Sequence, residues 1–136
     1  MKRMIAIVLL LGVTCSCSSM GSGSRSMGNG LPKRGGVTHV IVVWLKKPGD
    51  AEARKRVIAE SKKLAEIPGV VGVSAGEVIP SPRQVVDSSF DVAIVMTFGT
   101  REDLEKYTSH PKHQALVQNV IRPLVDHYRV YDIQNE

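Results

Sequence analysis

Residues 107–113 read Tyr-Thr-Ser-His-Pro-Lys-His, and this stretch decides how the second half of the fold is organised. Proline lacks a backbone N–H and disfavours helical dihedral angles at the residue before it. We therefore predict that one helix ends near Ser109 and that a second begins at Pro111 or one residue later. The break sets the directions of Tyr107 and of both histidines. No other stretch of the sequence brings a tyrosine and two histidines so close together.

A buried strand opens the folded part of the chain at residues 37–46 (V-T-H-V-I-V-V-W-L-K). Its side chains alternate between two faces. One face holds His39, Ile41, Val43 and Leu45, and the other holds Val40, Val42 and Trp44. Since both faces are apolar, we expect covering layers on both sides, with helices forming one of them. A single histidine on an aliphatic face is often a core residue, so this position alone does not assign a role to His39.

Hydrophobic periodicity and capping residues predict the remaining elements. The first are a helix from Ala51 to Ile67 capped by Asp50, a strand from Val70 to Ile79 that two glycines weaken or bulge, a loop over residues 80–89, and a strand from Phe90 to Phe98. A helix opened by Thr100 and Asp103 then leads to the break. After the break come a helix with an apolar stripe from Ala115 to Val125 and a kink at Pro123, and a strand from His127 to Ile133.

The resulting order is β-α-β-β-α-β with a broken second helix. It predicts an α+β, ferredoxin-like fold with a four-stranded antiparallel sheet whose helices cover one face only. The opposite face, with Val40, Val42 and Trp44, would expose a large apolar patch in a monomer. We therefore expect a homodimer in which two sheets face each other and close a dimeric α/β barrel.

The first 17 residues have the character of an export signal. Lys2 and Arg3 form a positive start, and the apolar run from Met4 to Val13 is about half the length of a membrane-spanning helix. Cys15 and Cys17 follow where a signal would be cleaved. The segment resembles a bacterial lipoprotein signal, with Cys17, or alternatively Cys15, as the lipidated first residue of the mature chain. We expect an exported protein that is anchored to a membrane by lipid or, if the cysteines are incidental, free outside the cytoplasm.

Residues 18–36 are rich in serine and glycine and hold few apolar side chains, so we predict a linker before a domain at residues 37–136. The charge excess of +5 belongs to this N-terminal part. The first 36 residues include five of the 18 basic residues and no acidic one, which leaves 13 basic against 13 acidic residues in the domain. A neutral domain with 4% aromatic residues lacks the features of a nucleic-acid-binding surface.

Over residues 37–133 the sequence resembles the Dabb family, the stress-responsive dimeric α/β-barrel proteins. The matching stretches are T-H-V-I-V-V-W-L-K, I-P-G-V with a later G-E, S-P-R before S-S-F-D-V-A, Y-T-S-H-P-K-H, and the closing V-Y-D-I. The resemblance implies a homodimer of ferredoxin-like subunits, each with a pocket between its sheet and its helices. In the family's polyketide cyclase member a tyrosine and a histidine carry out an aldol cyclisation, and they correspond to Tyr107 and His113. The strand-one histidine, here His39, lines the pocket.

The sequence leaves two main functions open. The first is small-molecule binding, in which His39, Ile41 and Val43 line a pocket for an apolar or carbonyl-containing ligand. The second is acid–base catalysis of the polyketide-cyclase kind, in which neutral His113 removes a proton beside a carbonyl and Tyr107 donates to the enolate oxygen. A structural alternative is that the same residues only hold the helix break.

A haem or metal site at His39, His110 and His113 ranks last among the functions. The H-x-x-H spacing across a proline has no accompanying acid or thiolate at metal-ligand spacing. Both cysteines precede the domain, which excludes a disulfide, a thiolate nucleophile and a thiolate metal ligand within it. We therefore expect no bound metal and no cofactor, and we expect His110 to cap the helix that follows it.

Overall fold

The computed structural model describes residues 33–136. The elements are β1 (Val37–Leu45), α1 (Ala51–Lys62), the 3₁₀ helix η1 (Lys63–Glu66), β2 (Val70–Glu77), β3 (Val92–Phe98), α2 (Arg101–Ser109), α3 (Pro111–Leu116), the π-helix η2 (Val117–Ile121), α4 (Arg122–Leu124) and β4 (Val125–Gln134). No helix in this part of the chain is long and apolar enough to cross a membrane. The predicted signal, with Cys15 and Cys17, lies outside the described residues.

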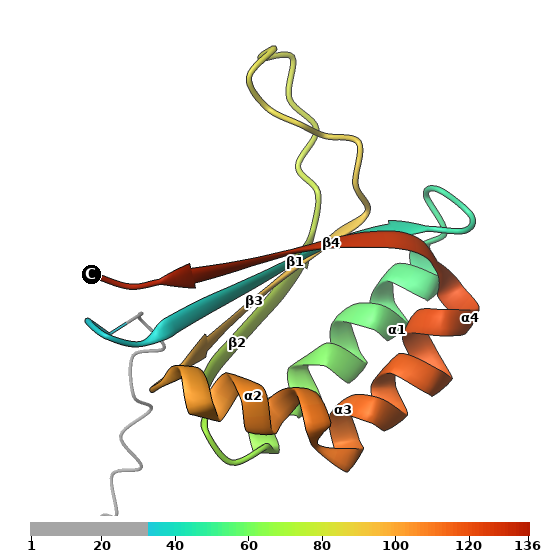
Figure 1. The fold of residues 1–136 in the computed structure, drawn as a ribbon. Coiled ribbons are helices and arrows are strands. Elements are labelled where there is room, and N and C mark those ends of the chain that lie inside the picture. The colour runs from blue at the N-terminus through green and yellow to red at the C-terminus, as the bar shows by residue number, and fades with distance from the viewer. Residues whose placement is uncertain (1–32) are drawn as a thin grey trace, which may run out of the picture.

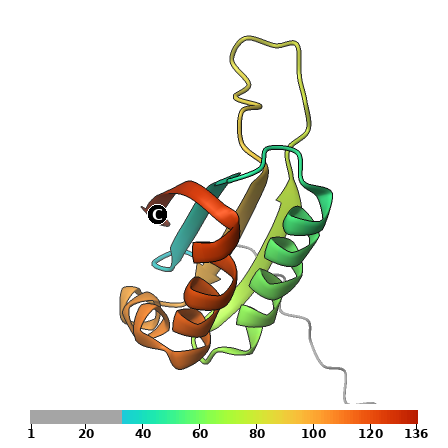
Figure 2. The same cartoon turned by 90° about the vertical axis from the view of Figure 1, so that its right-hand side faces the viewer.

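The four strands form one sheet in the order β2-β3-β1-β4, and each neighbouring pair is antiparallel. All the helices lie on one side of this sheet (Figure 1). Helix α1 and the run from α3 to α4 lie next to each other in that layer (Figure 2). The predicted ferredoxin-like fold is therefore confirmed. The predicted bulge in β2 is present as a register shift between Val70 and Gly72.

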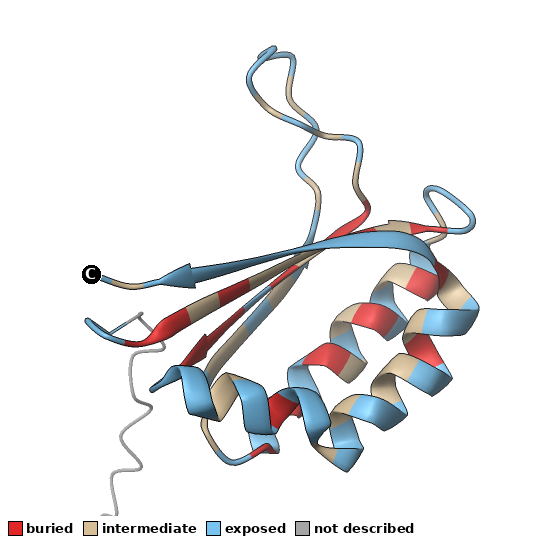
Figure 3. Cartoon of the chain, viewed as in Figure 1, coloured by how far each residue is buried: buried red, intermediate tan, exposed pale blue. Residues whose placement is uncertain are grey.

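The core lies between the sheet and the helices and follows the predicted alternation of the strands. Its buried apolar residues are Val37, Val43, Leu45, Ala53, Val57, Leu64, Ile67, Val92, Ile94, Met96, Phe98, Tyr107, Val120 and Val125. Buried positions gather where the two layers meet, whereas the edge strand β4 is exposed along most of its length (Figure 3). One face of β1 therefore packs on the helices, whereas the neighbouring strand β4 forms an exposed edge of the sheet.

Two aspartates fix the turn between β1 and α1. Asp91 is only 7% exposed and accepts hydrogen bonds from the backbone N–H groups of Leu45, at 2.9 Å, and Gly49, at 3.0 Å. Asp50 accepts from two N–H groups in the first turn of α1 and caps it, as predicted. These bonds satisfy donors that the turn would otherwise leave unpaired. Strand β3 begins at Val92, later than the predicted start at Phe90.

The helix break lies where the sequence predicts it. Helix α2 is capped by the Thr100 hydroxyl and ends at Ser109, and α3 begins at Pro111. Between them His110 has an extended backbone with φ −69° and ψ 136°, which a following proline favours. The His110 Nδ1 atom accepts a hydrogen bond from the N–H of Lys112 at 3.1 Å, so His110 caps α3 as expected.

The C-terminal helical run is shorter and less regular than its apolar pattern predicts. After α3 the backbone passes through η2 and the three-residue α4. Val125, which the pattern assigns to the helix, is the first residue of β4 and pairs with Leu45 of β1. Pro123 has no N–H with which to extend the helix. The strand therefore begins at Val125 instead of His127.

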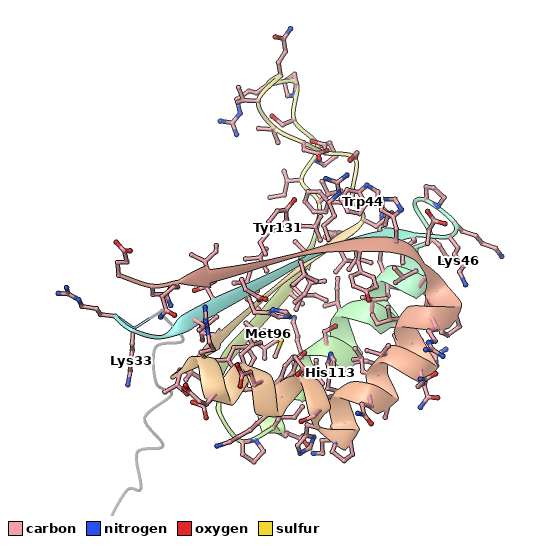
Figure 4. The ribbon with its side chains drawn as sticks, viewed as in Figure 1. Lys33, Trp44, Lys46, Met96, His113 and Tyr131 are labelled. Atoms are coloured by element: carbon pink, nitrogen blue, oxygen red, sulfur yellow. The ribbon has the colours of Figure 1, made fainter. Side chains whose placement is uncertain are left out.

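The face of the sheet away from the helices carries the predicted apolar surface. Trp44 and Tyr131 point to this side, and Met96 and His113 lie on the helix side (Figure 4). The apolar residues of this open face, from β1, β3 and β4, are Val40, Val42, Trp44, Ala93, Val95, Tyr131 and Ile133. Trp44 stacks on His127, with ring centroids 4.5 Å apart. No helix or strand of the described residues covers this surface, although the loop between β2 and β3 contacts it at Trp44, whose Nε1 donates to Ser89 Oγ at 3.2 Å.

The last residues of the predicted linker are bonded to the end of the sheet. They form a turn in which Gly35 has a φ of +80°, a conformation that glycine adopts without strain. The Gly35 N–H donates to the Asn135 carbonyl at 2.8 Å, and the Asn135 N–H donates to the Gly36 carbonyl at 2.9 Å. The two ends of the domain therefore lie side by side.

Candidate functional site

A cavity of about 140 Å³ lies between the sheet and the helices. Its apolar lining consists of Ile41, Val43, Leu64, Ile94, Met96, Leu116, Val117, Ile121 and Val130. Its polar lining consists of His39, Ser61, Tyr107, Thr108, His113 and Tyr128. Among these residues Thr108, Tyr128 and Val130 are exposed, so the cavity opens between β4 and the helix break.

The structure brings the predicted site residues together on this cavity. Tyr107 comes from the last turn of α2, His113 from α3, and His39 from β1. The ring centroids of Tyr107 and His113 are 4.6 Å apart, and those of His39 and Tyr107 are 6.0 Å apart. Ile41 and Val43, the predicted apolar binding residues, line the same cavity. The helix break therefore places two of the three polar groups, and β1 supplies the third.

One hydrogen bond and partial burial suit His113 to act as a base. Its Nδ1 atom lies 2.9 Å from the Thr108 carbonyl oxygen. Since a carbonyl can only accept, Nδ1 carries the proton and Nε2 is the unprotonated nitrogen of the neutral ring. Burial lowers the pKa of His113; the bond to Thr108 opposes this shift, and the nearby His39 lowers the pKa further. At neutral pH the ring is therefore neutral, with a lone pair on Nε2.

Tyr107 has the complementary property of a donor. Its side chain is 2% exposed and packs against Phe98, with ring centroids 5.1 Å apart. Burial alone raises the pKa of Tyr107 well above its ordinary value. The hydroxyl therefore stays protonated and can donate to a ligand oxygen. A neutral base and a protonated donor in contact are the two groups that acid–base chemistry at a carbonyl requires.

The structure adds Asp132, which lies within the strand predicted from His127 to Ile133 and to which the sequence analysis gives no role. Asp132 lies opposite His39 in the ladder between β1 and β4, and its Oδ1 atom is 2.5 Å from His39 Nδ1. The carboxylate holds the proton on Nδ1 and fixes the orientation of the buried ring. The sequence feature that could have indicated this pair is an acidic residue on the cavity side of β4. Its pairing with His39 depends on the register between the two strands, and the alternation of side chains does not determine that register.

The described residues provide no evident metal centre. Within residues 33–136 no three His, Cys, Asp or Glu side chains gather as metal ligands. His110, one of the three histidines considered for a metal or haem site, caps α3 and does not line the cavity. Of the two histidines at the helix break, His113 is the one that reaches the cavity.

The model of the stress-responsive A/B barrel domain, Dabb, matches residues 37–135. The chain belongs to the Dabb family. The match covers every strand and helix of the described fold, and it agrees with the resemblance carried by the sequence motifs. A comparison with curated proteins found no match.

Solved structures of other proteins share the fold of this Dabb domain. A Dabb family protein with a ferredoxin-like fold from Mesorhizobium loti is 25% identical, has a TM-score of 0.61 and aligns over 74% of this chain and 96% of its own. A dimeric ferredoxin-like protein of unknown function from Thermobifida fusca is 19% identical, with a TM-score of 0.61 over 76% and 94% of the chains. The hydroxynitrile lyase from Passiflora edulis is 17% identical, with a TM-score of 0.64 over 76% and 96%.

We predict that His113 titrates below 6.5 and that its titration makes stability depend on pH. The folded state then binds fewer protons than the unfolded state between the folded pKa and 6.5. The contribution of His113 to stability is thus complete above about 6.5 and is lost as the pH falls through the folded pKa. Urea unfolding from pH 7.5 to 5 should show the wild-type protein losing more stability than His113→Gln, whose amide does not titrate.

NMR titration of the His113 ring provides the direct check. A pKa at or above 6.5, or equal losses of stability in the two proteins, would contradict the assignment of a neutral His113.

Proposed function

We propose that this Dabb domain binds a small, largely apolar ligand with a carbonyl oxygen in the cavity between its sheet and helices. The observation that carries the proposal is the gathering of Tyr107, His113 and His39 in a cavity whose other lining is mainly aliphatic. A few polar groups among apolar walls are typical of small-molecule sites. In this proposal the carbonyl oxygen accepts from the Tyr107 hydroxyl, and aliphatic side chains enclose the body of the ligand.

The size of the cavity sets the size of the ligand. Sites for drug-sized ligands have volumes of roughly 300–1,000 Å³, whereas this cavity has about 140 Å³. Benzene binds in an engineered apolar cavity of about 150 Å³. The proposed ligand is therefore of the size of a six-membered ring with one or two substituents. An extended polyketide chain would not fit in this volume without rearrangement of the opening at β4.

A second candidate function is acid–base catalysis on the same class of ligand. It is favoured by the contact between Tyr107 and His113. The pKa of Tyr107 is raised, so its hydroxyl stays a donor, and the pKa of His113 is lowered, so its ring stays a base. In this function Nε2 of His113 takes a proton from the carbon beside the carbonyl, and Tyr107 stabilises the oxygen of the enolate. The hydroxynitrile lyase of the same fold supports enzymatic use of such a domain.

We predict that cyclohexanone binds in this cavity and that filling the cavity prevents binding. Val117 is partly buried in the cavity wall, so Val117→Phe should place a ring in the space that the ketone needs. Ligand-observed NMR should detect cyclohexanone with the wild-type protein and lose the signal with Val117→Phe. The matched control is Val85→Phe, because Val85 is 90% exposed in the loop between β2 and β3.

Thermal unfolding of both variants checks that each is folded at the assay temperature. Binding to Val117→Phe at wild-type affinity would place the ketone elsewhere, and no binding to the wild-type protein would remove the support for a small-ketone site.

The domain is also proposed to be a homodimer that buries the open face of the sheet. Apolar residues from three strands lie on this face, together with His127 and Arg129, and an exposed apolar surface is typical of an interaction site. The occupant we propose is the same face of a second copy. The Thermobifida fusca protein of the same fold, described as dimeric, supports this arrangement.

Replacing Trp44 by glutamate is expected to disrupt this dimer. Trp44→Glu would bury an unpaired charge in the contact between the sheets, which is strongly unfavourable. Light scattering should report a dimer for the wild-type protein and monomers or aggregates for the variant. Ala65→Glu, on the exposed side of the helix layer, is the matched control and should remain dimeric. A dimer of unchanged mass in Trp44→Glu would exclude this face as the interface.

Export and lipid anchoring are proposed from the sequence of the N-terminus. The positive start, the short apolar run and the following cysteines support a lipoprotein signal, with Cys17, or alternatively Cys15, as the modified residue. The serine- and glycine-rich segment would then connect the lipid to the domain. In this proposal the ligand site lies outside the cytoplasm, at a membrane surface.

We expect the protein expressed in a bacterium to fractionate with membranes, and its mature N-terminus to be an acylated cysteine in intact-mass analysis. Cys17→Ala should release it into the soluble fraction, whereas Cys15→Ala should leave it on the membrane. The opposite result would assign the lipid to Cys15. An unmodified cysteine, or cleavage beyond residue 17, would reject the anchor.

A further inference from the structure

One hydroxyl in the cavity wall is completely buried and has no partner. Ser61 lies in the last turn of α1, is 0% exposed and lines the cavity. Its Oγ atom makes no hydrogen bond to any residue that the structure describes. Buried polar side-chain atoms in proteins are nearly always paired, and leaving one unpaired destabilises the fold. An occupant of the cavity is the natural source of the missing partner.

The position of Ser61 in its helix strengthens this conclusion. A serine inside a helix commonly donates to the carbonyl four residues earlier, but the Ser61 hydroxyl makes no such bond. Its neighbours on the buried side of α1 and η1, Val57 and Leu64, are aliphatic. An alanine would therefore fill this position with the same backbone and without an unpaired group. The hydroxyl remains available to the cavity, where it can donate or accept one hydrogen bond.

We propose that Ser61 is a specificity-determining residue that hydrogen-bonds a second polar atom of the ligand. This inference rests on the proposed function, in which the carbonyl oxygen of the ligand accepts from the Tyr107 hydroxyl, next to His113. Those two residues come from α2 and α3, whereas Ser61 comes from α1, so the two polar contacts are made by separate walls of the cavity. The ligand class is thus narrowed to small cyclic or branched carbonyl compounds with an additional hydroxyl or carbonyl group.

The test compares three probes that differ only in the second oxygen: cyclohexanone, 3-hydroxycyclohexanone and 4-hydroxycyclohexanone. We expect the wild-type protein to bind at least one hydroxyketone about fivefold more tightly than cyclohexanone, the gain typical of one neutral hydrogen bond. Ser61→Ala should bind that hydroxyketone and cyclohexanone with equal affinity. Affinities are measured by NMR titration of the purified full-length protein.

Ser81→Ala is the matched control, because Ser81 lies in the loop between β2 and β3 and does not line the cavity. It should keep the preference for the hydroxyketone. Ser61→Ala should melt at or above the wild-type temperature, since it removes an unpaired buried group. If it fails to fold, Ser61→Cys, which keeps the size but has only a weak donor, replaces it in the comparison.

The outcomes separate this inference from the proposed function. Tight binding of a hydroxyketone that is lost in Ser61→Ala supports both. The role of Ser61 is overturned if the wild-type protein binds all three probes with equal affinity, or if the preference for the hydroxyketone persists in Ser61→Ala and Ser61→Cys. Either result leaves the proposed ketone site unaffected. If none of the probes binds the wild-type protein, the proposed function fails and the inference fails with it.

Discussion

Pro111 cannot donate a backbone hydrogen bond, and the helix layer therefore breaks at His110. The site depends on this constraint. The break turns the chain so that Tyr107, at the end of α2, and His113, at the start of α3, both face the sheet. Two local bonds hold the geometry: His110 caps α3, and His113 donates to the carbonyl of Thr108. In a continuous helix no extended residue would separate Tyr107 from His113, and the two side chains would not both face the sheet.

The two faces of the sheet have different roles in this domain. On the helix side, β1 and β3 supply half of the buried apolar core residues, and the exposed edge at β4 leaves room for a cavity. Strand β4 also supplies Asp132, whose carboxylate fixes the ring of His39. On the other side the same strands present the apolar surface around Trp44. Because β1 contributes to both sides, formation of the dimer proposed above and the geometry of the cavity depend on one strand.

Local patterns in the sequence predicted most of the fold and part of the site. Alternation in strand one, the Asp50 cap and the proline at residue 111 each depend on nearby residues, and each is found as predicted. The start of β4 at Val125 was predicted wrongly, because pairing with Leu45 outweighs an apolar helical stripe. Asp132 was missed because strand register is a tertiary property. Ser61 lies inside the predicted helix from Ala51 to Ile67, but its burial without a hydrogen-bond partner depends on tertiary packing, which helical periodicity does not give.

The central claim is that the helix break builds a site in which a ligand carbonyl meets Tyr107 and His113. A crystal structure of the protein grown with saturating cyclohexanone tests it most directly. The account predicts the ketone in the cavity, with its oxygen within about 2.5–3.0 Å of the Tyr107 hydroxyl. A cavity that holds only water, or a ketone bound on another surface of the domain, would contradict it.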